Sequence, residues 1–198
     1  MPGTEDLEIR KDDALIIVDV QNDFLPGGAL AVNDGDAVIP EINEYMRVFT
    51  INALPIFATR DWHPAGHCSF VDNGGPWPQH CVANSLGAQF AKELALPDDV
   101  TIVHKGTDVD KDAYSGFQDT DLADQLHAHG VKRVFVGGLA TDYCVLSTVS
   151  DALAEGFDVV LLMCTIRAVN VNPGDGDRAI ESMLGQGAIK HYGSVLAD

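Results

Sequence analysis

The stretch ALIIVDVQNDF at residues 14–24 decides the fold of this chain, because it opens with an unbroken run of apolar residues. A short run rich in Ile and Val is typical of a strand that is buried on both faces of a parallel sheet. Further runs of this kind occur at residues 55–59, 100–104, 133–137 and 158–162, with a weaker one at 188–192. The sequence therefore predicts about six strands.

Segments with helical periodicity separate these runs, at residues 38–48, 122–129, 143–155 and 178–184. Gly130 and Gly156 follow two of them, as glycines commonly do where a helix ends. Alternating strands and helices predict right-handed crossovers and a central, mostly parallel sheet with helices on both faces. We therefore expect an α/β fold with the three layers α/β/α.

Length and composition predict a single domain. The chain has 198 residues, of which 46% are hydrophobic and 21% charged, close to the globular average. We expect one domain over residues 1–198, with residues 1–12 as an N-terminal extension. The formal net charge of −18 repels phosphate backbones and anionic membranes, so neither nucleic acid nor a membrane is an expected partner. Association into homo-oligomers stays open.

The cysteine pattern and the first residues bear on the compartment. Cys68, Cys81, Cys144 and Cys164 are spread along the chain without a CxxC pair, and a domain of this length needs no disulfides. The chain opens with acidic residues rather than with a basic segment and a long apolar run, and no apolar stretch reaches the length of a transmembrane helix. We expect reduced thiols and a cytoplasmic protein.

Residues that can carry chemistry follow several of the predicted strands. In open α/β sheets, ligands bind beyond the carboxyl ends of the strands. Asp19 lies at the end of the first strand, Lys105 follows the third, and Cys144 lies in the turn after the fourth. We expect these three side chains to converge as a base, an ammonium group and a thiol nucleophile.

The surroundings of Cys144 and Asp19 favour these roles. Cys144 is expected in the first turn of a helix, where free amide N–H groups and the helix dipole favour a thiolate. Asp19 interrupts an apolar strand, where burial raises the pKa of a carboxyl toward that of a general base, and Lys105 would lower it again. The alternatives are a buried structural cysteine and an aspartate that caps a turn.

The irregular segment at residues 61–87 carries a second group of such residues. Its sequence DWHPAGH places Asp61, His63 and His67 within seven residues, and His80 follows. A carboxylate with imidazoles suits a divalent metal ion such as zinc, iron or manganese, and a hydrolytic site keeps coordination positions open. Exposed loop histidines are the alternative.

Aromatic side chains also fall in the loops near the predicted strand ends, namely Phe24, Trp62, Trp77, Tyr114 and Phe117. Rings at such positions can stack on a flat aromatic substrate. Ordinary loop packing is the alternative for each of them. We expect Phe24 and Trp77 above all to bind substrate, with Tyr114 as a further contact.

Several motifs, taken in order, resemble those of nicotinamidase/pyrazinamidase, a family of the isochorismatase-like cysteine hydrolases. They are DVQNDF at 19–24, DWHPAGH at 61–67, HKG at 104–106, AYSGF at 113–117 and GLATDYCV at 138–145. The resemblance extends from about Asp13 to the C-terminus. It implies hydrolysis of nicotinamide, and of pyrazinamide as well, to the acid and ammonia, with a role in NAD salvage.

The resemblance also implies roles for the residues of the triad. Asp19, Lys105 and Cys144 would act together, so that Cys144 attacks the carboxamide and forms a thioester, which water then hydrolyses. The amides of Ala140 and Cys144 would form the oxyanion hole, next to a cis peptide bond before Ala140.

For the metal site, the resemblance implies that Asp61, His63 and His80 hold one divalent ion. Zinc is the expected ion, with iron or manganese as alternatives. His67 is a further candidate ligand, because some relatives supply an additional ligand at this place. The metal would hold the pyridine nitrogen of the substrate, directly or through water.

Other functions remain open at this point. Metal-free carbamoyl or ureido amidohydrolases of the same superfamily share the triad, and only the histidine cluster separates them from a nicotinamidase. The isochorismatase reaction cleaves a vinyl ether and does not call for a cysteine nucleophile. A ligand-binding relative without turnover is a third possibility. Cys164 stands where many relatives carry Asp, and we expect it to be a packed structural cysteine.

Overall fold

The structure, a computed structural model, describes residues 7–193, and within them six parallel strands form one sheet in the order β3-β2-β1-β4-β5-β6. The strands are β1 (Asp13–Val18), β2 (Ile56–Asp61), β3 (Thr101–Lys105), β4 (Arg133–Leu139), β5 (Asp158–Arg167) and β6 (Ile189–His191). The α-helices are α1 (Ile39–Ile51), α2 (Leu122–Ala128), α3 (Leu146–Ala154) and α4 (Asp175–Gln186).

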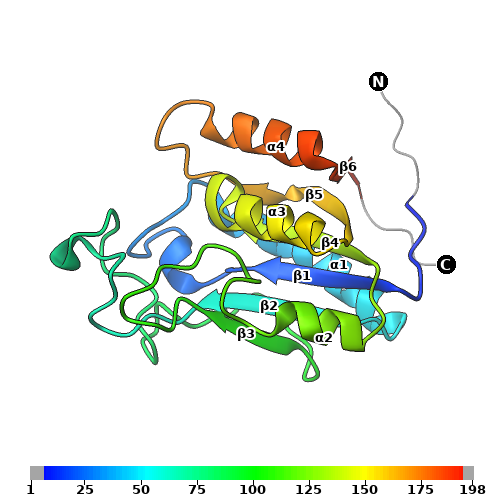
Figure 1. The fold of residues 1–198 in the computed structure, drawn as a ribbon, viewed down its shortest axis with the longest axis horizontal. Coiled ribbons are helices and arrows are strands. Elements are labelled where there is room, and N and C mark those ends of the chain that lie inside the picture. The colour runs from blue at the N-terminus through cyan, green and yellow to red at the C-terminus, as the bar shows by residue number, and fades with distance from the viewer. Residues whose placement is uncertain (1–6, 194–198) are drawn as a thin grey trace.

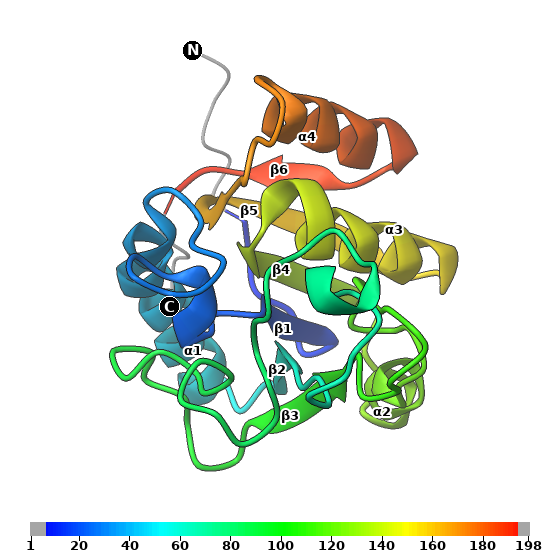
Figure 2. The ribbon, with the colours of Figure 1, turned by 90° about the vertical axis from the view of Figure 1, so that its left-hand side faces the viewer.

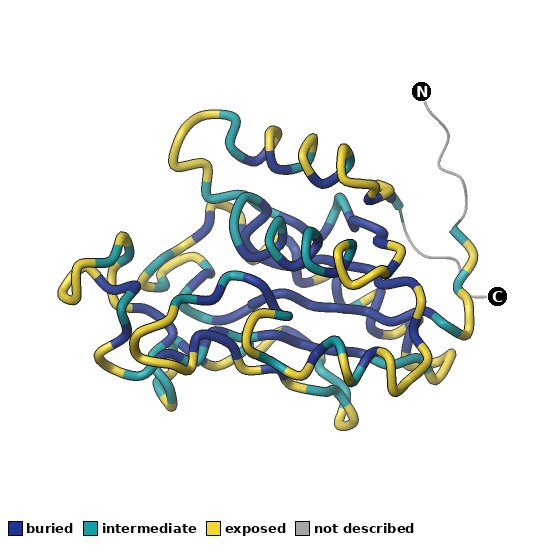
Figure 3. Tube along the Cα trace, viewed as in Figure 1, coloured by how far each residue is buried: buried dark blue, intermediate teal, exposed yellow. Residues whose placement is uncertain are grey.

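Helices cover both faces of this sheet (Figure 2). Helix α1 packs on one face, where Ile42 and Phe49 join Leu15 of β1 in a buried apolar cluster. Helices α2, α3 and α4 contribute to a second cluster on the other face, in which Leu126 lies with Ile16 of β1. The inner strands β1 and β4 are buried along their whole length, whereas the edge strands β3 and β6 are partly exposed (Figure 3). The expected α/β/α architecture is confirmed.

Strand β1 lies in the interior of the sheet and is buried over its whole length. Its alternate residues enter the two apolar clusters, because successive side chains of a strand point to opposite faces. Its first residue, Asp13, is also buried, and Arg133 of β4 donates two hydrogen bonds of 2.7 Å to this carboxylate. Such bidentate pairing compensates for the burial of both charges.

Most elements lie where the sequence predicts them, and the differences fall at their ends. Strand β5 continues beyond the expected end at residue 162 to Arg167, because its pairing with β4 shifts register between Val136 and Gly138. The helix expected over 143–155 begins as a π-helical turn, Thr141–Val145, and continues as α3. Among the described helices, none has the length and apolar character needed to cross a membrane.

The strand order changes direction beside β1. Strands β2 and β3 lie on one side of β1, whereas β4, β5 and β6 lie on the other. Such a switch point leaves room for a ligand at the carboxyl ends of the strands. The connection between β2 and β3, residues 62–100, is built of loops and one short 3₁₀ turn, and it extends beyond this edge of the sheet (Figure 1).

Candidate active site

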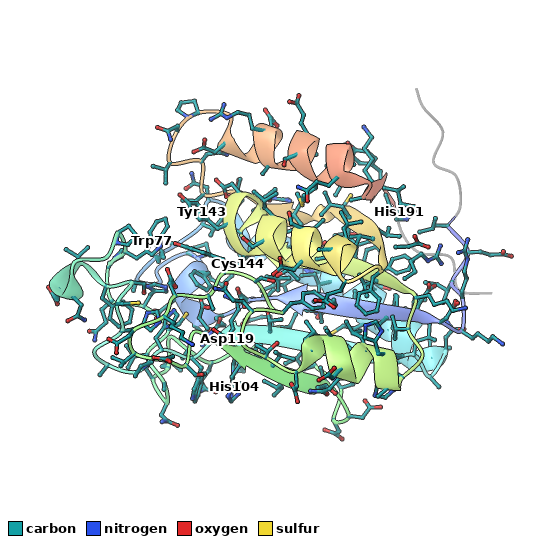
Figure 4. All side chains as sticks on the ribbon, viewed as in Figure 1. Trp77, His104, Asp119, Tyr143, Cys144 and His191 are labelled. Atoms are coloured by element: carbon teal, nitrogen blue, oxygen red, sulfur yellow. The ribbon has the colours of Figure 1, made fainter. Side chains whose placement is uncertain are left out.

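Three strand ends bring Asp19, Lys105 and Cys144 together, as the sequence predicts. Asp19 directly follows β1 in a left-handed conformation with φ of 49°, and Lys105 is the last residue of β3. Cys144 lies in the π-helical turn that joins β4 to α3, and Figure 4 shows it beside Tyr143 near the beginning of α3. All three side chains are buried.

The Lys105 ammonium group is the centre of this arrangement. Its Nζ lies 2.9 Å from Asp19 Oδ2 and donates a hydrogen bond of 3.4 Å to Cys144 Sγ. It also donates to Ala113 O at 3.2 Å and forms a close ion pair with Asp61. Lys105 therefore connects the base, the thiol and a residue of the histidine cluster.

Burial and charge set the protonation of the triad. Burial raises the pKa of the Cys144 thiol well above its ordinary value, and the Lys105 ammonium only partly offsets this. Desolvation therefore opposes the thiolate that the helix end is expected to favour. Burial likewise raises the pKa of Asp19 against the opposing effect of Lys105. Because the thiolate is the nucleophile, a thiol with a raised pKa needs a neighbouring base before it can attack.

A hydroxyl group fixes the orientation of the Asp19 carboxylate. Thr59 of β2 donates a hydrogen bond of 2.7 Å to Asp19 Oδ1. The other oxygen, Oδ2, is the one next to Lys105. Asp19 and Cys144 offer ligand-type atoms within 4.8 Å of each other, so the carboxylate is close enough to serve the thiol.

Asp61, His63 and His80 form a group that can hold a metal ion. Their ligand atoms all lie within 4.8 Å of one another, and the three residues are buried. The Nδ1 atoms of His63 and His80 are hydrogen-bonded, at 2.8 Å, to the carbonyl oxygens of Gly106 and Pro78. These bonds fix each imidazole so that Nε2 remains available as a ligand, which is the usual arrangement around a protein-bound metal. The donor set fits a divalent ion such as zinc.

A second group with the same spacing consists of Asp19, Asp61 and Cys144. The Lys105 ammonium group contacts all three of these side chains. A positive charge in this position disfavours a cation there. The histidine-containing group is therefore the better candidate metal site.

His67 does not join the candidate ligands in this structure. Its ring stacks on that of His63 with centroids 4.0 Å apart. Both of its nitrogens already have partners, with Nδ1 2.7 Å from Ser69 Oγ and Nε2 3.0 Å from Lys111 O. The expectation that His67 is a further metal ligand is therefore not supported, and its hydrogen bonds instead connect the loop at residues 67–69 to the loop at Lys111.

A pocket joins the thiol to the histidine group. Of the expected substrate contacts, Phe24, Trp77 and Tyr114 all line it, together with Cys144. Trp77 Nε1 donates a hydrogen bond of 2.9 Å to the Tyr114 hydroxyl. The Trp77 ring stands edge-on to that of Tyr143, with ring centroids 5.0 Å apart, and Figure 4 labels both residues. The pocket therefore has an aromatic wall beside the thiol.

The other two aromatic residues considered from the sequence lie elsewhere. Trp62 stacks on His104 with ring centroids 5.1 Å apart, and the Arg60 guanidinium lies 3.9 Å from the Trp62 ring. The ring of Phe117 packs against that of Phe157, with ring centroids 6.3 Å apart. Ordinary packing accounts for both.

Several pocket residues escaped the reasoning from sequence. They are Leu30, Val32, Asp112, Ala113, Tyr143 and Val169. Tyr143 could have been found, because it precedes Cys144 in the same turn. Val169 could not, because it is an isolated apolar residue in a loop that Asp142 holds in place by accepting its amide hydrogen bond at 2.9 Å.

The peptide bond between Leu139 and Ala140 is cis, which confirms that expectation. Ala140 and Cys144 both line the pocket, so their amides remain the predicted oxyanion hole. Cys164 lies within β5, half-buried, rather than after its end, and it is not among the residues that line this pocket.

Comparisons with known proteins agree with this geometry. The family model of the isochorismatase domain matches residues 13–189. The nicotinamidase of Escherichia coli (strain K12) is 39% identical over 206 residues, covering 93% of this chain and 95% of that protein.

Among solved structures, the pyrazinamidase of Pyrococcus horikoshii in complex with zinc is 50% identical, with a TM-score of 0.88 and coverage of 92% of this chain and 99% of that one. An L. infantum protein in complex with nicotinate is 38% identical, with a TM-score of 0.86 and coverage of 96% and 98%. The chain, with its six-stranded parallel sheet and its buried cysteine at the switch point, therefore belongs to the isochorismatase family.

Proposed function

We propose that this protein is a nicotinamidase, which hydrolyses nicotinamide to nicotinate and ammonia and also accepts pyrazinamide. The observation that carries the proposal is one pocket that Cys144 lines together with Asp61, His63 and His80. An aromatic ring with a carboxamide on it has the two features that such a pocket can bind. The relatives named nicotinamidase and pyrazinamidase support the same assignment.

In the proposed reaction, Asp19 accepts the proton of the Cys144 thiol as the sulfur attacks the carboxamide carbon. The carbonyl π bond opens to an oxyanion, which the amides of Ala140 and Cys144 stabilise. Asp19 then gives its proton to the nitrogen, the C–N bond breaks, and ammonia leaves a thioester on the sulfur. Asp19 next takes a proton from water, whose oxygen attacks the thioester carbon. The C–S bond then breaks, Asp19 returns the proton to the Cys144 sulfur, and nicotinate leaves.

Lys105 has a supporting part in this scheme. Its ammonium group lies beside the Asp19 carboxylate and favours the charged form that can act as a base. Its hydrogen bond to Cys144 Sγ also stabilises negative charge as it develops on the sulfur. The base and nucleophile are thus held by one cation.

Asp61, His63 and His80 would hold a divalent metal ion, with zinc as the proposed ion. When bound, such an ion supplies a Lewis acid to which the ring nitrogen of the substrate can be anchored, directly or through water. Phe24 and Trp77 would flank the ring, since both line the pocket.

The test is ammonia release from nicotinamide by purified wild type and Cys144→Ala protein, each with and without a chelator. We expect release only from the metal-replete wild type. Absence of release from that sample would refute the proposed function. Release that survives complete removal of metal would favour a metal-free amidohydrolase, the class to which the ureidoacrylate amidohydrolases among the relatives point.

The place of the reaction in the cell is part of the same proposal. Nicotinate formed from nicotinamide can re-enter NAD synthesis, so the enzyme would act in NAD salvage. Among the described residues the four cysteines are free thiols, which supports the expected cytoplasmic location.

A further inference from the structure

The backbone N–H and C=O of Asp61 are hydrogen-bonded to the side chain of Gln21 rather than to the neighbouring strand. Strands β1 and β2 pair in parallel, with hydrogen bonds that advance two residues at a time, such as Leu15 N to Pro55 O and Asp19 N to Thr59 O. The next step of this ladder would pair the N–H of Asp61 with the C=O of Asp19, and the C=O of Asp61 with the N–H of Gln21. However, the chain leaves the ladder at Asp19, whose φ is 49°.

The side-chain amide of Gln21 takes the place of the missing peptide group. Its Oε1 accepts a hydrogen bond of 2.8 Å from Asp61 N, and its Nε2 donates one of 2.8 Å to Asp61 O. Nε2 also donates to Ala88 O at 3.0 Å. The backbone N–H of Gln21 is engaged separately, with Asp19 O at 2.8 Å. Gln21 is completely buried, so its polar atoms have no access to water and depend on these protein partners.

The residue held in this way has two contacts that matter. The Asp61 carboxylate forms an ion pair with Lys105, and its second oxygen, Oδ2, lies 3.7 Å from His63 Nε2. A displacement of its backbone would move a candidate metal ligand and a neighbour of the triad at once. The chain can therefore turn away after β1, which brings Asp19 next to Lys105, while Gln21 keeps the backbone of Asp61 in place.

We propose that Gln21 is a positioning residue for the metal site, acting through the backbone of Asp61. This rests on the proposed function in so far as Asp61, His63 and His80 bind a metal ion. Residues that orient ligands from behind typically change metal affinity or activity by about 10–100-fold when they are replaced.

The chain offers a matched control in Asn43. Its side-chain amide also bridges the backbone of a distant loop, accepting a hydrogen bond of 3.0 Å from Ala95 N and donating one of 2.9 Å to Glu93 O. Asn43 lies in α1 and is not among the residues that line the pocket. A change there removes an amide clamp of the same hydrogen-bond pattern, at a more exposed position, without touching the ligand set.

The experiment measures zinc affinity of the full chain by competition with a chromophoric chelator, for wild type, Gln21→Met, Gln21→Glu and Asn43→Met. We expect Gln21→Met to raise the zinc Kd by about 10–100-fold and Asn43→Met to change it by less than about twofold. Gln21→Glu, which can still accept from Asp61 N but cannot donate, should fall between wild type and Gln21→Met. Excess zinc should restore much of the ammonia release lost in Gln21→Met.

Unchanged zinc affinity in folded Gln21 variants would overturn the proposal, and so would an equal loss in Asn43→Met. Failure of both Gln21 variants to fold would also count against it, because Gln21 would then be a folding residue rather than a positioning one. The zinc measurement needs no substrate. If wild type binds zinc but releases no ammonia from nicotinamide, the proposed function fails while the role of Gln21 stands.

Discussion

The two sides of the pocket are built in different ways. On the thiol side, Lys105 ends β3, Asp19 directly follows β1 and Cys144 lies in the turn after β4, so the sheet largely determines how they are arranged. On the histidine side, Asp61 ends β2, but His80 lies in the long connection between β2 and β3, which a short backbone bridge between His63 and Val82 and the side chain of Asp23 hold in place. We therefore expect substitutions in the connection between β2 and β3 to change metal affinity more than they change the arrangement of Asp19, Lys105 and Cys144.

Replacing the nucleophile should have the largest effect and should separate the two sides most clearly. Cys144→Ala removes the atom that forms the thioester, so kcat should fall on the order of 10⁴-fold or more. Zinc affinity should stay near wild type, because Cys144 is outside the histidine-containing ligand group. Steady-state ammonia release and zinc competition on the same preparation give both numbers. A large loss of zinc affinity in this variant would contradict the separation.

Asp61 is where the two sides meet, and its replacement should affect both. Asp61→Asn keeps the shape but removes the negative charge that faces Lys105 and the candidate metal. We expect zinc affinity to fall by more than the roughly 100-fold upper range for residues behind a ligand, and kcat at saturating zinc to fall as well. If kcat were fully restored by zinc, the contact between Asp61 and Lys105 would have no part in the triad.

The same contrast between strand ends and loops explains which site residues could be predicted from the sequence. The strand ends are marked by apolar runs that stop at a charged or catalytic residue, as at Asp19 and Lys105, so the triad could be predicted without any resemblance. The choice between His67 and His80 could not, since both are loop histidines. What separates them is hydrogen bonding: both nitrogens of His67 are taken, whereas His80 uses only Nδ1 for Pro78.

The pKa of the Cys144 thiol could not be predicted from the sequence, because it depends on how the thiol is buried. The pattern after β4 predicts the position of the thiol, but its pKa depends on side chains that come from distant parts of the chain. The structure buries the sulfur beside Lys105, Asp19 and Asp61, and desolvation dominates the combined effect. No local sequence pattern carries that information.

Replacing Asp23, whose carboxylate holds the loop next to His80, should have a smaller effect on zinc affinity. Asp23 Oδ2 accepts a hydrogen bond of 2.7 Å from the amide of Cys81, the residue after His80. Asp23→Ala should therefore loosen His80 and raise the zinc Kd by about tenfold.

The matched control is Asp142→Ala, whose carboxylate accepts hydrogen bonds from the amides of Val169, which lines the pocket, and of Asn170, which follows it. We expect this variant to raise the KM for nicotinamide while zinc affinity is unchanged. Equal zinc affinities in Asp23→Ala and Asp142→Ala would mean that the histidine side does not depend on its loop clamps.

The smallest effect is expected at the second thiol near the carboxyl end of a strand, Cys164. Because β5 continues through a register shift to Arg167, Cys164 is a half-buried residue inside the strand and not a residue at its end. Cys164→Ala should leave kcat and zinc affinity near wild type and lower the free energy of unfolding by about 1 kcal/mol or less. Ammonia release and urea denaturation check the two parts. Loss of turnover in Cys164→Ala, with turnover retained in Cys144→Ala, would identify Cys164 as the nucleophile. That result would contradict the role assigned to Cys144 beside Lys105.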